Sequence, residues 1–114
     1  ISHDKLLIEH LSNIRDMVPV GECLYGIKPS IIGYYTERIS VAPPLPRLSD
    51  ESFNASLKDP GCRFFYLVGF ASPAYPVIYY PLERMRSSLV AISAAPAPAH
   101  GAGPVGILAK WVAR

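Results

Sequence analysis

Few side chains in this sequence could carry out chemistry, and they do not stand at the spacings of a catalytic or metal site. His3, His10 and His100 have no Cys, Asp or Glu at ligand spacing that would close a zinc site. His3 and His10 share one face of the first expected helix, and we expect that face to be exposed and both side chains to be solvated. The serines form no nucleophile-elbow motif and no nucleophile–base pair is visible. We therefore expect no metal, no cofactor and no self-sufficient hydrolase or redox enzyme.

One turn has the position of a ligand site. Gly26 to Ser30 connect an apolar segment, a strand expected over 22–27, to a helix expected over 29–36. In α/β proteins a ligand often lies at such a strand end, where an anionic group can meet the N-terminus of the helix. Pro29 suits the first turn of a helix but removes one N–H donor, which argues against a strong anion site.

The same helix and its flanks carry the residues that we select as candidates for binding. Lys28 and Ser30 stand at its N-terminal end, Tyr34 and Tyr35 lie within it, and Arg38 follows its C-terminal end. The tyrosines could form an aromatic surface for a sugar or lipid. However, adjacent residues on a helix point about 100° apart, so one tyrosine packing inward is an equally ordinary interpretation. Arg38 also suits the negative end of the helix dipole.

The two cysteines, Cys23 and Cys62, are too few for a disulfide scaffold and too far apart for a zinc knuckle. Each stands at the beginning of an expected strand. If these strands are parallel neighbours, the two sulfurs could meet and form a disulfide in an oxidising compartment. Alternatively, both are buried thiols that pack as small hydrophobic side chains. The sequence leaves both possibilities open.

The elements that must position these residues alternate between helix and strand. We expect helices over residues 3–17, 29–36, 50–58 and 81–87. We expect strands over residues 22–27, 38–42, 62–70, 89–93 and 105–112. This alternation predicts an α/β fold, a small three-layer domain with a mostly parallel sheet of about five strands. The last two strands, joined by a proline-rich loop, predict a C-terminal antiparallel hairpin.

Composition narrows the class of protein. The chain has 114 residues, the size of one domain, and we expect a single α/β domain over 1–114. The net charge is only +2 and the basic residues are scattered, so we expect no nucleic-acid partner. Only 18% of the residues are charged, which is below the average of about 25%. A lightly charged surface suggests a face that a partner covers.

Three segments together resemble a known family: Val20–Tyr25, Ser30–Arg38 with its Tyr34-Tyr35-Thr36-x-Arg38 motif, and the closing strand Ile107–Val112. They are similar to the extracytoplasmic C-terminal domain of polytopic GT-C glycosyltransferases, the protein mannosyltransferase and aminoarabinose transferase group. The similarity extends over nearly the whole chain. In that family a soluble α/β tail follows the last membrane helix, and the sugar donor is linked to a lipid.

The resemblance implies a non-catalytic domain on the extracytoplasmic (periplasmic) face of a membrane-bound glycosyltransferase. The family's catalytic carboxylates lie in the membrane portion, so no carboxylate of this chain would inherit a catalytic role. The partner would be the membrane-embedded portion of the same polypeptide, whose active site the domain caps or organises, together with the lipid-linked sugar or the acceptor. Cys23 and Cys62 would then lie in an oxidising compartment.

Two hypotheses follow. Because the chain begins with Ile1 rather than Met, we expect it to be a segment of a larger membrane protein, as the resemblance implies. The alternative is a free-standing small α/β module that binds a ligand at the strand C-termini near residues 27–30.

Overall fold

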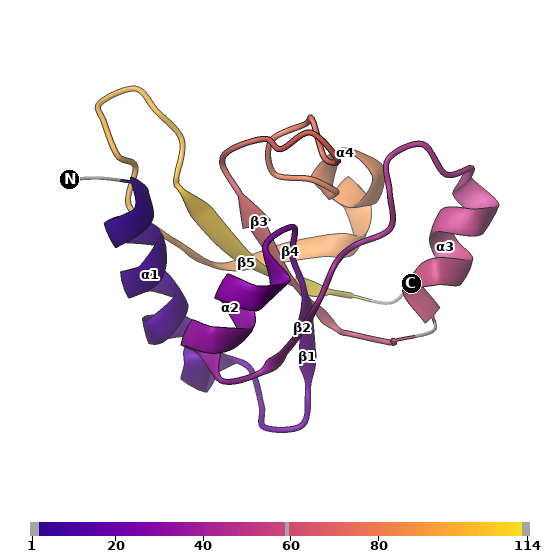
Figure 1. The fold of residues 1–114 in the computed structure, drawn as a ribbon, viewed down its shortest axis with the longest axis horizontal. Coiled ribbons are helices and arrows are strands. Elements are labelled where there is room, and N and C mark those ends of the chain that lie inside the picture. The colour runs from indigo at the N-terminus through magenta and orange to yellow at the C-terminus, as the bar shows by residue number, and fades with distance from the viewer. Residues whose placement is uncertain (1–2, 59, 113–114) are drawn as a thin grey trace.

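The computed structural model describes residues 3–58 and 60–112. The helical elements are α1 (His3–Ile14), the 3₁₀ turn η1 (Arg15–Met17), α2 (Pro29–Thr36), α3 (Asp50–Lys58), α4 (Leu82–Met85) and the 3₁₀ turn η2 (Arg86–Ser88). The strands are β1 (Cys23–Tyr25), β2 (Ile39–Val41), β3 (Phe64–Val68), β4 (Leu89–Ala94) and β5 (Gly106–Trp111). The order of elements agrees with the sequence prediction (Figure 1). Four strands are shorter than predicted, and β4 extends one residue further, to Ala94.

The strands form one sheet in the order β2-β1-β3-β5-β4. β1 pairs in parallel with β2 and with β3, whereas β5 pairs antiparallel with β3 and β4. The five-stranded α/β fold and its C-terminal hairpin are therefore confirmed. In Figure 1, α1 and α2 lie toward the left of the sheet, and α3 and α4 toward the right.

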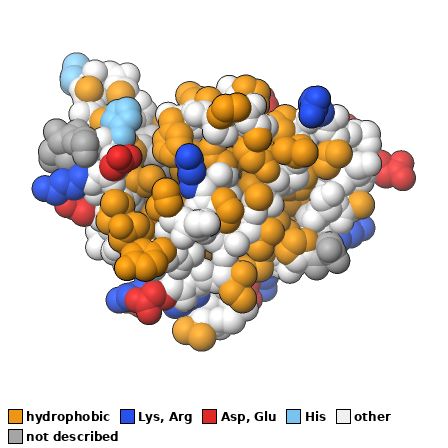
Figure 2. Space-filling view, viewed as in Figure 1, with side chains coloured by type: hydrophobic (Ala, Val, Ile, Leu, Met, Phe, Trp, Pro, Cys, Tyr) orange, Lys and Arg blue, Asp and Glu red, His pale blue; other side chains and the backbone are white. Residues whose placement is uncertain are grey.

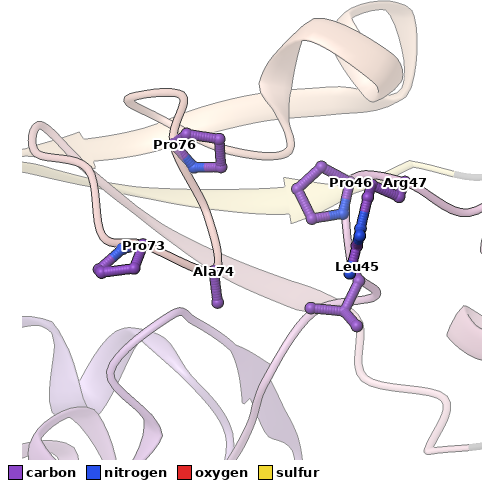
Figure 3. Close-up of a pocket in the computed structure, with 6 residues that line it drawn as sticks. All are labelled: Leu45, Pro46, Arg47, Pro73, Ala74 and Pro76. Atoms are coloured by element: carbon purple, nitrogen blue, oxygen red, sulfur yellow. The ribbon is translucent and has the colours of Figure 1, made fainter.

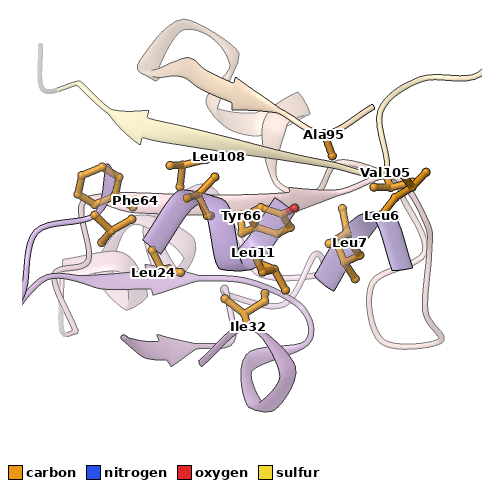
Figure 4. Packing of buried hydrophobic residues seen from close by; sticks show 13 residues of the cluster. Leu6, Leu7, Leu11, Leu24, Ile32, Phe64, Tyr66, Ala95, Val105 and Leu108 are labelled. Carbon is orange, nitrogen blue, oxygen red and sulfur yellow. The ribbon is translucent and has the colours of Figure 1, made fainter. Parts of the chain in front are cut away.

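β3 is the central strand, and all five of its residues are buried. Successive side chains of a strand point to opposite faces, and here both faces are covered by helices. Phe64, Tyr66 and Val68 pack in the cluster that contains Leu11 of α1 and Ile32 of α2 (Figure 4). This is why the apolar run of β3 does not alternate with polar residues.

The other face of the sheet packs against α3 and α4. Phe65 and Leu67 of β3 lie in a second buried cluster with Phe53 of α3 and Met85 of α4. Ser49 caps α3, because the Ser49 hydroxyl accepts the Ser52 N–H at 3.2 Å. The domain is thus a three-layer sandwich with a separate hydrophobic cluster on each side of the sheet.

Cys23 and Cys62 are joined in a disulfide, with an S–S distance of 2.04 Å. Cys23 begins β1 and Cys62 precedes β3, and Leu24 stands beside Phe64 in the parallel ladder. Parallel pairing thus brings the beginnings of both strands together, which is the condition under which the two sulfurs could meet. The bond covalently closes a loop that contains α2, β2 and α3.

We predict that the double variant Cys23→Ser/Cys62→Ser loses roughly 3–4 kcal/mol of unfolding free energy, because the bridge closes a loop of 39 residues. Urea denaturation measures the loss. Adding dithiothreitol should destabilise the unmodified chain by a similar amount and leave the double variant unchanged. A loss below about 1 kcal/mol would show that the bridge does not constrain the unfolded chain as this mechanism requires.

Candidate functional site

The carboxyl ends of β1, β2 and β3 meet at one edge of the sheet because these strands run parallel. From β1 the chain crosses to β2 through α2, which packs on one face. From β2 it crosses back to β3 through α3, which packs on the other face. The topology therefore reverses between β1 and β3, and ligands of open α/β sheets bind outside such a switch point. We call this the carboxyl edge.

Lys28 and Ser30 lie at the carboxyl edge, as predicted. Both side chains are exposed at the N-terminal end of α2, and Pro29 occupies its first turn. Lys28 stands at the N-cap position without a side-chain capping bond. These two residues are free to meet a ligand.

Arg38 lies at the other end of α2, and its side chain holds backbone rather than a ligand. Its Nε donates to the carbonyl of Val18 at 2.8 Å, and one terminal nitrogen donates to the carbonyl of Arg15 at 3.1 Å. Arg15 begins η1, and Val18 is its C-cap. Since α2 has eight residues, it spans about 12 Å. The structure therefore separates Arg38 from Lys28 and Ser30.

The two tyrosines of α2 have different surroundings. Tyr34 is 76% exposed. Tyr35 is half-buried and packs against the α1–α2 cluster. Their rings meet edge to face, with centroids 4.9 Å apart. Tyr34 can therefore contact a partner, whereas Tyr35 contributes chiefly to packing.

The loops that follow β2 and β3 at the carboxyl edge form a pocket of about 580 Å³. One wall comes from the connector between β2 and α3, with Leu45, Pro46 and Arg47. The other wall comes from the loop after β3, which lies opposite the connector in Figure 3 and contributes Pro73, Ala74 and Pro76. The volume lies within the range of small-molecule sites, about 300–1,000 Å³.

Two buried tyrosines fix the distance between the walls. The Tyr75 hydroxyl donates to the Pro43 carbonyl at 2.7 Å, and the Tyr80 hydroxyl donates to the Pro44 carbonyl at 2.5 Å. Burial raises the pKa of both phenols, so they remain protonated donors at neutral pH. The rings also contact each other, with centroids 5.4 Å apart. The pocket is thus formed before any ligand arrives.

Arg84 binds the end of the connector and the first residue of α3. Its guanidinium donates to the Leu48 carbonyl at 3.0 Å and to the Asp50 carboxylate at 2.7 Å. It also lies 4.1 Å from the centre of the Phe53 ring, a cation–π contact. These interactions occupy Arg84 with structural partners and leave Arg47 as the arginine that lines the pocket.

A second polar group lies away from this edge, and it corrects the sequence prediction for His10. His10 is only 6% exposed, so the expectation of a solvated side chain was wrong. Its Nδ1 lies 2.6 Å from the Tyr66 hydroxyl, and its Nε2 lies 2.9 Å from the Ser93 hydroxyl. The ladder of β4 shifts register between Ala91 and Ser93, which places Ser93 opposite Leu108.

The side chains of His10, Tyr66 and Ser93 are arranged like a nucleophile, a base and an orienting group. However, their hydrogen bonds are donated in the wrong direction for catalysis. The Tyr66 hydroxyl is buried, and His10 is its recorded hydrogen-bond partner among the described residues. Burial raises the pKa of Tyr66, so it stays protonated and donates to Nδ1. Nε2 then carries the imidazole proton and donates to Ser93, so it cannot act as the base for this serine. The group links α1, β3 and β4.

The sequence did contain a signal for this burial. His10 follows Leu7 by three residues and precedes Ile14 by four, so it lies on the apolar stripe of α1. Assigning it to the exposed face with His3 overlooked that spacing. The backbone of Gly106 also lies close to the Tyr66 hydroxyl. A Cβ at this position would lie within 3 Å of the hydroxyl oxygen.

Among residues 3–58 and 60–112, no cluster of three or more His, Cys, Asp or Glu side chains could hold a metal ion. In the same part of the chain, no helix has the length and hydropathy to cross a membrane. Comparison with known proteins found no matching family model, curated protein or solved structure.

The buried histidine predicts a pH dependence of stability. Desolvation lowers the pKa of His10 in the folded chain below its ordinary value of 6.5. At a pH between the folded pKa and 6.5, the unfolded chain therefore binds more protons than the folded one. The free energy of unfolding should therefore fall as the pH drops through 6.5 and level off below the folded pKa. Urea denaturation at a series of pH values measures this.

His10→Gln should remove this part of the pH dependence. The matched control is His100→Gln, because His100 is exposed in the loop between β4 and β5. That variant should keep the original slope. An unchanged slope in His10→Gln would contradict the assignment to His10.

Proposed function

We propose that this chain is the non-catalytic extracytoplasmic domain of a membrane-bound glycosyltransferase that uses a lipid-linked sugar donor. The resemblance of Val20–Tyr25 and Ser30–Arg38 to that family suggests the class. The observation that carries the proposal is the disulfide between Cys23 and Cys62. Structural disulfides persist in oxidising compartments such as the periplasm and are rare in the cytosol. The disulfide therefore supports an extracytoplasmic location.

The surface supports a domain that rests against a partner. Several large hydrophobic side chains are exposed on α2, the connector and the loop after β3: Ile31, Tyr34, Leu45, Val77 and Ile78. Figure 2 shows hydrophobic side chains spread widely over the viewed face, with few charged groups near its middle. Extended exposed apolar surface is typical of interaction sites. The proposed partner is the membrane-embedded portion of the same polypeptide, with its active site.

The proposed role is to cap or organise that active site, beside the lipid-linked sugar or the acceptor. Two of the carboxylates that could otherwise be considered for catalysis form surface ion pairs instead. Glu37 pairs with Arg15, and Asp50 pairs with Arg84 at 2.7 Å. In this proposal the parent protein is the glycosyltransferase, and its catalytic carboxylates lie outside this chain.

The whole gene and the redox state of the cysteines test this proposal. We predict several apolar segments of ~20 residues upstream of Ile1, and a Cys23–Cys62 pair that is oxidised in cells making the whole protein. Alkylation with a maleimide before and after reduction, read as a mass shift, measures the redox state. A start codon directly before Ile1, or free thiols in the cell, would contradict the proposal.

A second candidate function is a free-standing module that binds a ligand at the carboxyl edge. The specific observation that favours it is the pocket between the connector and the loop after β3. Lys28 and Ser30 lie at the same edge of the sheet, where the alternative hypothesis from the sequence located the site. Here the walls of the pocket extend that site toward residues 45–47 and 73–76.

Thermal shift with phosphate, nucleotides and sugar lipids tests this second candidate. A specific ligand at a hundredfold excess over its dissociation constant should stabilise the chain by about 2.7 kcal/mol. Ala74→Trp, which fills the pocket, should abolish the shift if the ligand lies there. Lys28→Ala should abolish it if the ligand lies at the N-terminus of α2. Absence of a shift with every ligand would count against this candidate.

A further inference from the structure

We infer that the pocket at the carboxyl edge binds a soluble organic anion: one carboxylate or phosphate group attached to an apolar body. This inference rests on the second proposed function and names the class of ligand. Three observations support it: the lining is mostly apolar, the polar groups beneath it already have hydrogen-bond partners, and one arginine lines the pocket.

The lining offers carbon surface and few hydrogen-bond donors. Pro46, Pro73 and Pro76 have no backbone N–H, and the side chains of Leu45 and Ala74 are aliphatic. Where a sugar or nucleobase contacted these walls, it would lose bonds to water and gain few replacements, which is unfavourable. An apolar body loses nothing of this kind. The lining therefore selects against polar ligands.

The polar groups beneath the walls are already paired. The carbonyls of Pro43 and Pro44 accept the hydroxyls of Tyr75 and Tyr80. The Leu45 carbonyl accepts the Leu48 N–H at 3.3 Å. These groups fix the shape of the pocket and are not left to recognise a ligand. Because the walls are held apart in advance, binding requires little ordering of the protein.

Arg47 supplies the one formal charge among the lining residues. Within residues 3–58 and 60–112, no recorded ion pair or hydrogen bond occupies its side chain, in contrast to Arg84 with its Asp50 partner. A guanidinium binds carboxylate or phosphate with two parallel hydrogen bonds. A pocket that joins apolar walls to one available guanidinium is thus complementary to an apolar molecule with a single acidic group.

Amide NMR titration of the 114-residue chain tests the inference with three probes. Naphthoate combines an apolar body with a carboxylate, naphthalenemethanol keeps the body without the charge, and inorganic phosphate supplies a charge without the body. We expect naphthoate to shift signals of residues 45–48 and 72–77. We expect the other two probes to bind at least about tenfold more weakly, since each lacks one of the two contributions.

Two variants and one control assign the site. Arg47→Gln should weaken naphthoate binding by roughly 10- to 100-fold, because it removes a charge-assisted hydrogen bond. Ala74→Trp should abolish binding by filling the pocket. Arg86→Gln removes an exposed arginine outside the lining and should leave the dissociation constant within about twofold. The amide spectrum of each variant without probe reports whether it is folded.

Several outcomes would overturn the inference. Equal affinity for naphthoate and naphthalenemethanol would remove the role of charge, and unchanged affinity in folded Arg47→Gln would remove the role of Arg47. Binding to phosphatidylglycerol vesicles without binding to naphthoate would indicate a membrane surface in place of a pocket for soluble anions. A sugar or nucleotide found in this pocket would overturn the inference yet support the second proposed function, and if no ligand of any kind bound, both would fail.

Discussion

The parallel pairing of β1 with β3 is the interaction on which the remaining structure depends. It places β3 in the middle of the sheet, where both faces of Phe64–Val68 are buried under helices. It also brings Cys23 and Cys62 together, so the bridge fixes the same pair of strands covalently. Because β1 also pairs in parallel with β2, the connector after β2 and the loop after β3 leave from the same edge of the sheet.

The carboxyl edge and the buried cluster under α1 use buried polar groups in two different ways. At the carboxyl edge, Tyr75 and Tyr80 donate to backbone carbonyls and shape a preformed pocket. Under α1, the Tyr66 hydroxyl donates to His10, and the chain of bonds continues to Ser93. Both arrangements satisfy groups that would be costly to bury alone. The first leaves an open surface beside Arg47, whereas the second buries His10 and Tyr66 in the core and leaves Ser93 half-buried.

The parts of the fold that were predictable from the sequence are those that local patterns encode. The alternation of helices and strands and the C-terminal antiparallel hairpin follow from patterns among neighbouring residues, and both were predicted. The His10 contacts were missed because they join residues 56 and 83 positions apart. The pocket was missed for the same reason, because its walls are held by bonds spanning 32 and 36 positions. Arg38 was selected for binding on local grounds, yet its partners are the carbonyls of Arg15 in η1 and of Val18 just after it.

The tyrosine bonds to Pro43 and Pro44 have a consequence for how this pocket could change over time. The acceptors are main-chain carbonyls, which every amino acid supplies, and the residues that line the cavity take no part in those two bonds. Substitutions at 45–47 or at positions 73, 74 and 76 can therefore alter selectivity while the gap between the walls persists. The residues that hold the walls apart are therefore distinct from those that line the pocket. Related chains or a designer could change the lining residues while the positions of the walls stay the same.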